Sequence, residues 1–150
     1  MIELALFEPD IPQNSAACMR LVACFETVLH IIEPCGFLFD ARKIRRIGMD
    51  YVEHAQVIRY THWEDFLCKN DKRVILATTK ASIPYQNFSF EKKDIILMGR
   101  ESSGVPSYVH QYVDKCVKIP MSSRARSLNM AMSAGILLSE ALRQTEQFMQ

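Results

Sequence analysis

Short apolar runs alternate along this chain with stretches in which apolar residues recur at helical spacing. The apolar runs are rich in Val, Ile and Leu, and they predict six strands, at Ile2–Phe7, Leu29–Ile32, Gln56–Tyr60, Val74–Ala77, Ile95–Met98 and Cys116–Ile119. Most of these runs are nearly continuous rather than alternating with polar residues. That pattern is typical of parallel sheets, whose strands are buried on both faces.

The segments between the predicted strands have the period of amphipathic helices. Helices are predicted at Ser15–Val28, Ala41–Ile47, Trp63–Lys69, in a short segment near Tyr108, and from near Ser127 to Gln144. Thr61, with Glu64 three residues later, predicts a capping box for the third helix, and Ser127 is the predicted N-cap of the last. Strands that alternate with helices predict an α/β fold, a three-layer domain with a mostly parallel sheet that takes in residues 1–150 as one domain.

Composition narrows the class of protein. The chain is 49% hydrophobic and 23% charged, which is typical of a soluble globular protein. Its formal net charge is +1, so any nucleic-acid binding has to come from a local basic patch. Its apolar runs fall short of the roughly 20 residues of a membrane span, and its first residues carry acids where a signal peptide is basic. We therefore expect a cytoplasmic protein without membrane contact.

Cysteine and histidine spacing excludes two further classes of site. The five cysteines are scattered, odd in number and without a C-x-x-C pair, so neither a disulfide framework nor a zinc site is encoded, and buried reduced thiols are expected. The four histidines show no ligand spacing either. We predict no metal.

Ligands in open α/β sheets bind beyond the carboxyl ends of the strands, so the loops that follow strands are the candidate sites. The first such loop, Glu8–Arg20, runs into a predicted helix. On a helical wheel, Arg20 lies off the apolar arc formed by Ala17, Cys18, Leu21, Val22 and Phe25. It can therefore face a cleft, or it is an ordinary solvated arginine.

The second loop, Met98–Pro106, contains the sequence GRESSG. Val105 and Pro106 stand where a phosphate loop needs Lys and Ser or Thr, so it is not a Walker site. Arg100 replaces the first glycine of a G-x-S-x-G nucleophile elbow, which excludes a hydrolase serine at Ser102. What remains is a glycine-bracketed turn with free backbone N–H groups and one carboxylate, Glu101. It is either a cradle for a polar ligand or an ordinary tight turn.

The third loop, which follows Ile119, is polar and leads directly into the long C-terminal helix. A separate basic run lies on the predicted helix after the second strand, and it is either a solvated face or a phosphate-binding surface. The basic residues of these two segments are Arg124 and Arg126 in the loop and Arg42, Lys43, Arg45 and Arg46 in the run.

The three loops together resemble the motifs of the SpoU branch of the SPOUT methyltransferases. EPDIPQN and Arg20 match the first motif, GRESSGVP the second, and IPM followed by RSLN and SEALRQ the third. HIIEPCGF and RRIGMDY further resemble the small single-domain, TrmL-like subgroup, which methylates the wobble nucleotide of certain tRNAs. The resemblance covers nearly the whole chain.

This resemblance implies a SPOUT fold with a C-terminal trefoil knot and a homodimer formed through the knot face. The first and last helices offer apolar positions such as Leu21, Phe25, Leu138 and Leu142, which are either interface residues or residues buried within one chain. The resemblance also implies methyl transfer from S-adenosylmethionine to a ribose 2′-hydroxyl of RNA, with tRNA the expected partner. The implied cofactor contacts are Ala77, Thr78, Gly99, Gly104, Ile119, Met121, Ser127, Leu128 and Asn129. The implied catalytic residues are Arg20, Asn14, Glu101, Ser127 and Asn129, and the basic residues named above become the implied RNA contacts.

The chemistry of the guanidinium restricts the role that Arg20 can have in catalysis. The family's arginine is thought to accept the 2′-hydroxyl proton, but a guanidinium with a pKa above about 12 is a poor base at neutral pH. We expect Arg20 to stay charged and to stabilise the forming alkoxide. Glu101 is expected to orient it, within one chain or across a dimer interface.

Three departures from the family pattern keep alternatives open. The family's Thr-Gly-Asn after the first asparagine is replaced by Ser15, Ala16 and Ala17. Leu-Ser-Asn in the third motif is replaced by residues 130–132, and a late tyrosine by Ser139. Another tRNA or rRNA position therefore stays open, as do a catalytically weak RNA-binding module that keeps the cofactor and an unrelated α/β protein.

Overall fold

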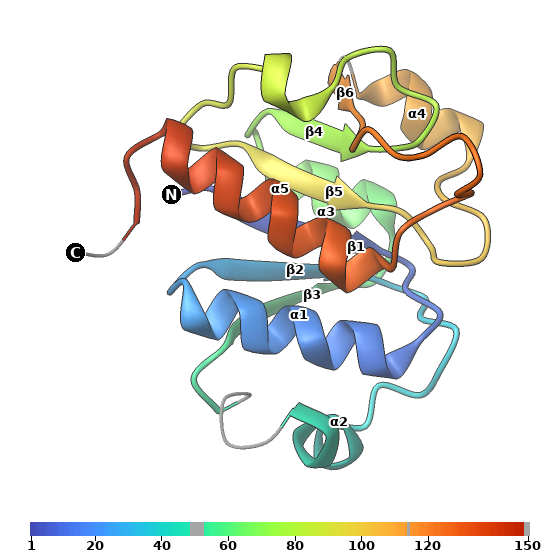
Figure 1. Cartoon of the computed structure of the whole chain (residues 1–150). Coiled ribbons are helices and arrows are strands. Elements are labelled where there is room, and N and C mark those ends of the chain that lie inside the picture. The colour runs from blue at the N-terminus through green and yellow to red at the C-terminus, as the bar shows by residue number, and fades with distance from the viewer. Residues whose placement is uncertain (49–52, 114, 149–150) are drawn as a thin grey trace.

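The computed structural model describes residues 1–48, 53–113 and 115–148. Strands and helices alternate through these residues as the sequence pattern predicts (Figure 1). The strands are β1 (Glu3–Phe7), β2 (Val28–Ile32), β3 (Gln56–Tyr60), β4 (Val74–Ala77), β5 (Ile95–Met98) and β6 (Lys115–Val117). The helices are α1 (Pro12–Cys24), α2 (Ala41–Gly48), α3 (Trp63–Lys69), α4 (Ser107–Tyr112) and α5 (Met130–Gln144), with a 3₁₀ turn at Tyr85–Asn87.

The described strands form one sheet in the order β3-β2-β1-β5-β4-β6, and each neighbouring pair is parallel. Starting from β1, the chain builds outward to β2 and β3 on one side, and then crosses to β4, β5 and β6 on the other. The loops that leave β1 and β5 therefore diverge at the point where the order reverses. In a parallel sheet this is where a crevice for a ligand forms.

Helices cover both faces of the sheet, which confirms the three-layer prediction. α1 and α5 lie side by side on one face, and α3 lies behind the sheet (Figure 1). The core on the first face gathers residues such as Leu4, Val22 and Leu138, and the core on the second gathers Phe7 and Phe66, all with side chains at 0% exposure. The four inner strands are buried along most of their length, which requires the continuous apolar runs seen in the sequence, whereas the edge strands β3 and β6 are more exposed.

The second core also contains a buried polar cluster. His30 lies between Tyr60 Oη, 2.9 Å from its Nδ1, and Glu3 Oε2, 2.9 Å from its Nε2. Lys72 Nζ donates to Glu3 Oε1 at 2.6 Å. Burial alone would raise the pKa of Glu3, but the hydrogen bonds from His30 and Lys72 outweigh it and hold that pKa below its usual value. The cluster thereby satisfies its polar groups inside an otherwise apolar layer.

The ends of α1 differ from the predicted Ser15–Val28. The helix begins at Pro12, because proline has a helical φ and needs no N–H partner in the first turn. It ends at Cys24, since Glu26 has a φ of 51° and β2 begins two residues later. Its buried face is also rotated from the predicted arc: Ala17 is exposed, whereas Ala16 and Met19 are buried.

Two predicted caps are wrong by one or two residues. In α3 the side chain of His62, not Thr61, accepts the hydrogen bond from Asp65 N, and Thr61 instead donates to the Asp65 carboxylate. In α5 the N-cap is Asn129 rather than Ser127, with its Oδ1 accepting from Met132 N at 3.1 Å. An amide oxygen caps a helix as well as a hydroxyl does.

The C-terminal third of the chain is interlaced with the segment between β4 and β5. Lys118 exchanges backbone hydrogen bonds with Ile83 and Tyr85. Further along, the side chain of Gln144 in α5 bonds the backbone of Phe88 and Phe90. These contacts join the C-terminal part of the chain to residues 83–90, and the predicted knot itself stays a prediction.

The structure also bears on the predicted interface residues, the burial of the cysteines and the presence of membrane spans. Leu138 and Leu142 are 0% and 1% exposed, so they belong to the core and are not free for an interface. All cysteines are free, but Cys24 and Cys68 are exposed rather than buried. Within the described residues, no helix is long and apolar enough to cross a membrane.

Candidate active site

The carboxylate of Glu101 connects the two loops that diverge at the switch point. It accepts hydrogen bonds from Asp10 N at 2.8 Å, from Ile11 N at 3.3 Å and from Asn14 Nδ2 at 3.2 Å. Glu101 follows β5, whereas the three donors follow β1. A charged acceptor strengthens each of these bonds relative to a neutral pair.

Two further contacts reinforce this connection. Asp10 accepts hydrogen bonds from both the backbone N–H and the hydroxyl of Ser102, with 3.1 Å between Ser102 N and Asp10 Oδ2. Arg100 forms an ion pair with Glu8 and lies over the ring of Phe7, 5.5 Å from its centroid. Residues 8–14 and 100–102 are therefore held together by hydrogen bonds in both directions and by an ion pair. The side chains of the GRESSG turn thus bind the loop that follows β1.

Glycine is needed at both ends of that turn. Arg100 and Gly104 exchange backbone hydrogen bonds of 2.9 Å, and Gly104 has a φ of 67°, which glycine adopts without strain. A Cβ on Gly99 would lie 2.8 Å from the Gly104 backbone, closer than real atoms approach. The two glycines therefore allow the chain to fold back tightly at the end of β5.

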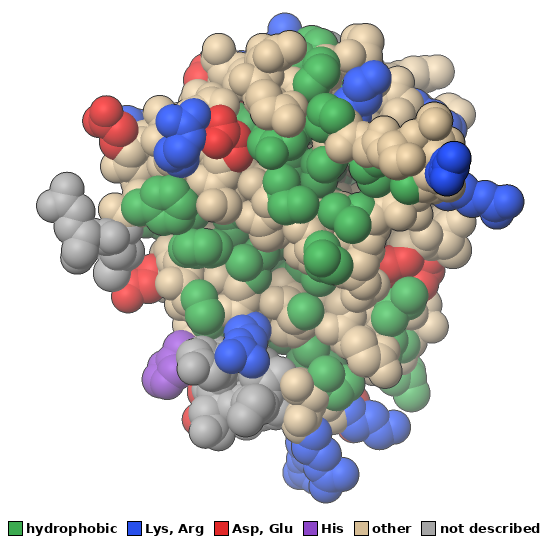
Figure 2. All heavy atoms as spheres, viewed as in Figure 1, with side chains coloured by type: hydrophobic (Ala, Val, Ile, Leu, Met, Phe, Trp, Pro, Cys, Tyr) green, Lys and Arg blue, Asp and Glu red, His purple; other side chains and the backbone are tan. Residues whose placement is uncertain are grey.

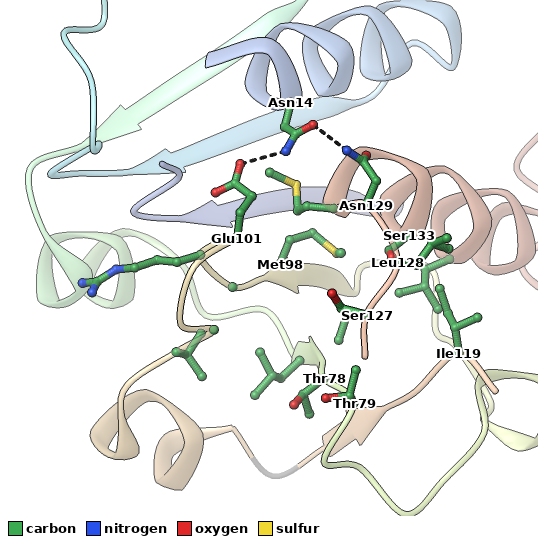
Figure 3. A pocket seen from close by; sticks show the side chains of 18 of the residues that line it. Asn14, Thr78, Thr79, Met98, Glu101, Ile119, Ser127, Leu128, Asn129 and Ser133 are labelled. Carbon is green, nitrogen blue, oxygen red and sulfur yellow. Dashed lines mark hydrogen bonds between the residues drawn. The ribbon is translucent and has the colours of Figure 1, made fainter. Parts of the chain in front are cut away.

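Asn14 extends the network to the third loop. Its Oδ1 accepts from Asn129 Nδ2 at 2.9 Å while its own Nδ2 donates to Glu101, as the dashed lines in Figure 3 show. Asn129 also caps α5, so one side chain both starts that helix and joins it to α1. Three segments far apart in the sequence thus meet in a single chain of hydrogen bonds.

A cavity of about 350 Å³ opens beside this chain of bonds, with Ser127, Thr78 and Ile119 among its walls (Figure 3). Its lining is mixed, apolar from Leu76 and Met98 and polar from hydroxyls. The structure brings every predicted cofactor contact to this one cavity. These residues are Ala77, Thr78, Gly99, Gly104, Ile119, Met121, Ser127, Leu128 and Asn129.

The predicted catalytic residues divide into two groups. Asn14, Glu101, Ser127 and Asn129 line the cavity. Arg20, two turns along α1 from Asn14, is an exposed residue outside the described lining. Within one chain the Glu101 carboxylate bonds the loop after β1, so the expected contact between Glu101 and Arg20 stays a prediction.

The predicted RNA contacts lie on the surface rather than in the cavity. Arg42, Lys43 and Arg46 are exposed on α2, where Lys and Arg side chains gather at the lower edge of the molecule (Figure 2). Arg124 and Arg126 are exposed in the loop before α5. The side chain of Arg45, and residues 49–51 of the RRIGMDY segment, lie outside the described residues.

Sequence reasoning missed several residues around the cavity. Thr79, Met98 and Ser133 line it, and Asp10 supports it through Ser102. Asp10 is in EPDIPQN and Met98 adjoins GRESSGVP, so the acid of the first motif and the serines of the second were the available signal, whereas Thr79 and Ser133 lie outside the motifs. Cys18 lies beside Met130, and burial, with the charge of Glu101, raises the pKa of its thiol to about 12, so it stays neutral. No cluster of three potential metal ligands occurs among the residues described.

These features define an α/β protein with a ligand cavity at the switch point of a parallel sheet, walled by three loops that share one hydrogen-bond network. A model of the SpoU rRNA Methylase family matches residues 1–139. The chain therefore belongs to the SpoU methylase family.

Individual relatives agree with this assignment. The tRNA (cytidine(34)-2′-O)-methyltransferase of Beijerinckia indica is 46% identical over 94% of this chain and 90% of its own length. A structure described as "Structural insights into the 2-OH methylation of C/U34 on tRNA" is 34% identical, with a TM-score of 0.91 over 96% of this chain and 95% of that one. An AdoMet-bound rRNA methyltransferase from Sinorhizobium meliloti is 25% identical, with a TM-score of 0.84 over 95% of this chain and 56% of that one.

Substitutions at Asn129 should separate its cap from its bond to Asn14. Asn129→Ala removes both, and loss of the cap should lower the free energy of unfolding by about 0.5–2 kcal/mol. Asn129→Asp keeps an acceptor for Met132 N but cannot donate to Asn14. Urea unfolding should therefore show Asn129→Asp to be the more stable variant. Equal losses in both variants would mean that the bond to Asn14, not the cap, is the main contribution.

Proposed function

We propose that the protein transfers a methyl group from S-adenosylmethionine to a ribose 2′-hydroxyl of tRNA, at the wobble nucleotide of the anticodon loop. The observation that carries the proposal is the convergence of the predicted cofactor positions on one cavity beside the Asn14–Glu101–Asn129 network. The tRNA (cytidine(34)-2′-O)-methyltransferase that matches nearly the whole chain supports the choice of substrate. A cytoplasmic location follows from that substrate.

The departures from the family pattern leave this network intact. Ala16 is buried in the core and Ala17 is on the surface, so neither replaces a group that bonds Glu101 or Asn129. Met130 lines the cavity and Met132 is 60% exposed. Because the hydrogen-bonding side chains are retained, we favour an active enzyme over an RNA-binding module without catalysis.

The cavity fits the cofactor in size and chemistry. Its volume of about 350 Å³ is within the range of small-molecule sites, which are mostly apolar with a few placed polar groups. Ile119 and Leu128 would hold the adenine, and Thr78 and Ser127 would offer hydroxyls to its polar atoms. Bound there, S-adenosylmethionine supplies an electrophilic methyl group on a sulfonium.

The contribution of the protein is then alignment and electrostatics. Asn14 and Asn129 have fixed orientations, because each donates and accepts within the network. Groups held in this way can position a ribose without reorganising during the reaction. Arg20 is not among the described residues that line the cavity of its own chain, and we propose that it acts on the cavity of a second copy.

The face formed by α1 and α5 is the proposed site of that second copy. Several hydrophobic side chains are exposed on this face, among backbone and other side chains (Figure 2). Ile11 and Met132, near the starts of α1 and α5, are 41% and 60% exposed, and Leu21 and Phe25, towards the end of α1, are half-buried. Exposed apolar side chains gathered on one face can mark an association site. Ile11, which lines the cavity, and Met132 are at the starts of the two helices, so a partner on this face would lie beside the cavity.

The reaction can be tested with bulk tRNA and radiolabelled S-adenosylmethionine. We expect label in tRNA, and mapping of the modified nucleotide should place it on the ribose of the wobble position. Label in rRNA, or at another tRNA position, would redirect the substrate assignment. The absence of any transfer at saturating cofactor, together with normal cofactor binding, would favour the RNA-binding module.

Arg20 should be essential to the rate and dispensable for the cofactor. Removing a preorganised donor costs roughly 10²- to 10³-fold in rate, so Arg20→Ala should lose at least that much methylation with S-adenosylmethionine affinity unchanged. Arg20→Lys keeps the charge but not the planar fork and should recover part of the rate. Lys93→Ala, an exposed cation just before β5 at the opposite end of the sheet, is the control.

The pH dependence of Arg20→Lys separates two roles. If the residue stabilises the alkoxide, the lysine variant should not gain rate as its ammonium loses a proton. A rate that rises steeply towards the reference pKa of lysine, near 10.4, would instead favour a general base. Activity of Arg20→Ala within about tenfold of the wild type would exclude both roles.

The proposed dimer should have twice the 17.3 kDa mass of one chain in solution. An obligate interface is expected to bury more than about 2,000 Å² in total. Met132→Lys places a charge in the exposed apolar face and should shift the protein to monomers in analytical ultracentrifugation. Ile58→Lys, at a 45% exposed position on edge strand β3, should leave the mass unchanged. A wild-type monomer at micromolar concentration would contradict the dimer.

A further inference from the structure

A second hollow lies at the carboxyl ends of β2 and β3, and no role assigned above involves it. It has a volume of about 500 Å³ and is formed by the loop between β2 and α2 together with the end of β3. Its lining combines the apolar side chains of Phe37, Leu38 and Phe39 with the ionic side chains of Glu33 and Arg59. We call it the β2–β3 groove.

The planar guanidinium of Arg59 is held in a fixed orientation within this groove. Its guanidinium carbon lies 4.3 Å from the centroid of the Phe39 ring, and its Nη2 donates to Glu33 Oε1 at 2.5 Å. These two contacts fix the plane of the guanidinium, while 44% of the side chain stays exposed. The rings of Phe37 and Phe39 lie at 25° to each other with centroids 6.5 Å apart. The groove thus offers planar groups whose orientation is already set.

The apolar part of the groove is unusually open for a folded protein. Leu38 is 89% exposed, although it adjoins two half-buried phenylalanines. Cys35 also lines the groove, and burial raises the pKa of its thiol to about 11, so it acts as a neutral wall rather than as a nucleophile. The available chemistry is stacking and hydrogen bonding, not covalent reaction.

The groove is fixed in place beside the candidate active site. Gly36 N donates to Pro9 O at 2.9 Å, and a Cβ on Gly36 would lie 3.0 Å from Asp10 Cα. Asp10 is one of the residues that Glu101 binds. At the other end of the loop, Asp40 Oδ1 accepts from Arg42 N at 2.8 Å and so starts α2. The groove therefore lies between the Glu101 network and the exposed basic side chains of α2.

A nucleic-acid base is the ligand that matches all of these features. Unstacked RNA bases bind by stacking on aromatic rings and on arginine planes. Carboxylates such as Glu33 and Asp40 can accept hydrogen bonds from the amino groups of bases. The exposed cations Arg42, Lys43 and Arg46 are placed to contact the adjoining phosphates. An apolar peptide could pack on the phenylalanine rings, but it would not also bind the guanidinium plane, the carboxylates and the basic side chains of α2.

We propose that the β2–β3 groove binds the base of an RNA nucleotide that neighbours the methylated one, with Arg59 as the stacking plane. The proposal rests on the proposed function for the identity of the RNA. It assigns the HIIEPCGF segment a direct part in holding the substrate strand. The base enters the groove while its neighbour places a ribose at the cavity.

The affinity of each variant for an anticodon stem-loop, measured by fluorescence anisotropy, tests the proposal without depending on methyl transfer. Loss of stacking on one base typically costs about 5- to 150-fold in affinity. Arg59→Leu should weaken RNA binding in this range, and Arg59→Lys, which keeps the charge without the plane, should also weaken it. Leu38→Ser should weaken RNA binding as well, and because this side chain is 89% exposed its replacement should change stability little. Lys93→Gln should bind RNA as the wild type does.

Abasic substitutions in the RNA identify the base. One abasic site next to the target nucleotide should weaken binding to the wild type, and the same site should cause no further loss with Arg59→Leu. S-adenosylmethionine affinity should be unchanged in every variant. Unchanged RNA affinity in Arg59→Leu, or losses that simply add for every abasic site, would overturn the proposal. A wild type that binds RNA with this pattern but transfers no methyl would contradict the proposed function alone.

Discussion

The acceptance of three hydrogen bonds by the Glu101 carboxylate is the interaction on which the site depends. Its donors follow β1, about 90 residues earlier in the chain, and one of them, Asn14, continues to Asn129 at the start of α5. Charge-assisted bonds of this kind are stronger than neutral ones, and leaving such a carboxylate unpaired would be costly. The cavity exists where it does because these three segments cannot separate without breaking this network.

Helix α5 links the cavity to the outer surface. Its inner side carries Asn129, Ser133 and Leu137 to the cavity wall, whereas Met132, one residue from Ser133, is 60% exposed. Residues at i, i+4 and i+8 share one side of a helix, so a single stretch serves both roles. A partner docked on α1 and α5 would thus touch the helix that Asn129 caps. Assembly and the geometry of the site are expected to be coupled for this reason.

Much of the fold could be predicted because most of its strands are buried on both sides. That burial demands continuous apolar runs, and the predicted Val74–Ala77 and Ile95–Met98 match the structure. The predicted Gln56–Tyr60 also matches, although it is a largely exposed edge strand with polar residues among its apolar ones. The caps could not be predicted as well. The polar loop before α5 offers several capping side chains, and sequence does not say which one meets Met132 N. The cavity-lining positions came from the motif resemblance, while the partners of Glu101 required the folded chain.

The loop that follows β1 contacts both the groove and the Glu101 network, so a base bound in the groove can affect the geometry of the cavity. Gly36 in the groove loop packs on Pro9 and Asp10, and Asp10 N is a donor to Glu101. A base stacked on Arg59 would hold the groove loop against this segment and thereby favour the arrangement in which Glu101 and Asn14 are bonded. A ligand shifts an equilibrium only by its difference in affinity for the two states. An RNA that fills both sites would therefore stabilise the network more than one that fills the cavity alone, and substrate choice would be made partly away from the reacting ribose.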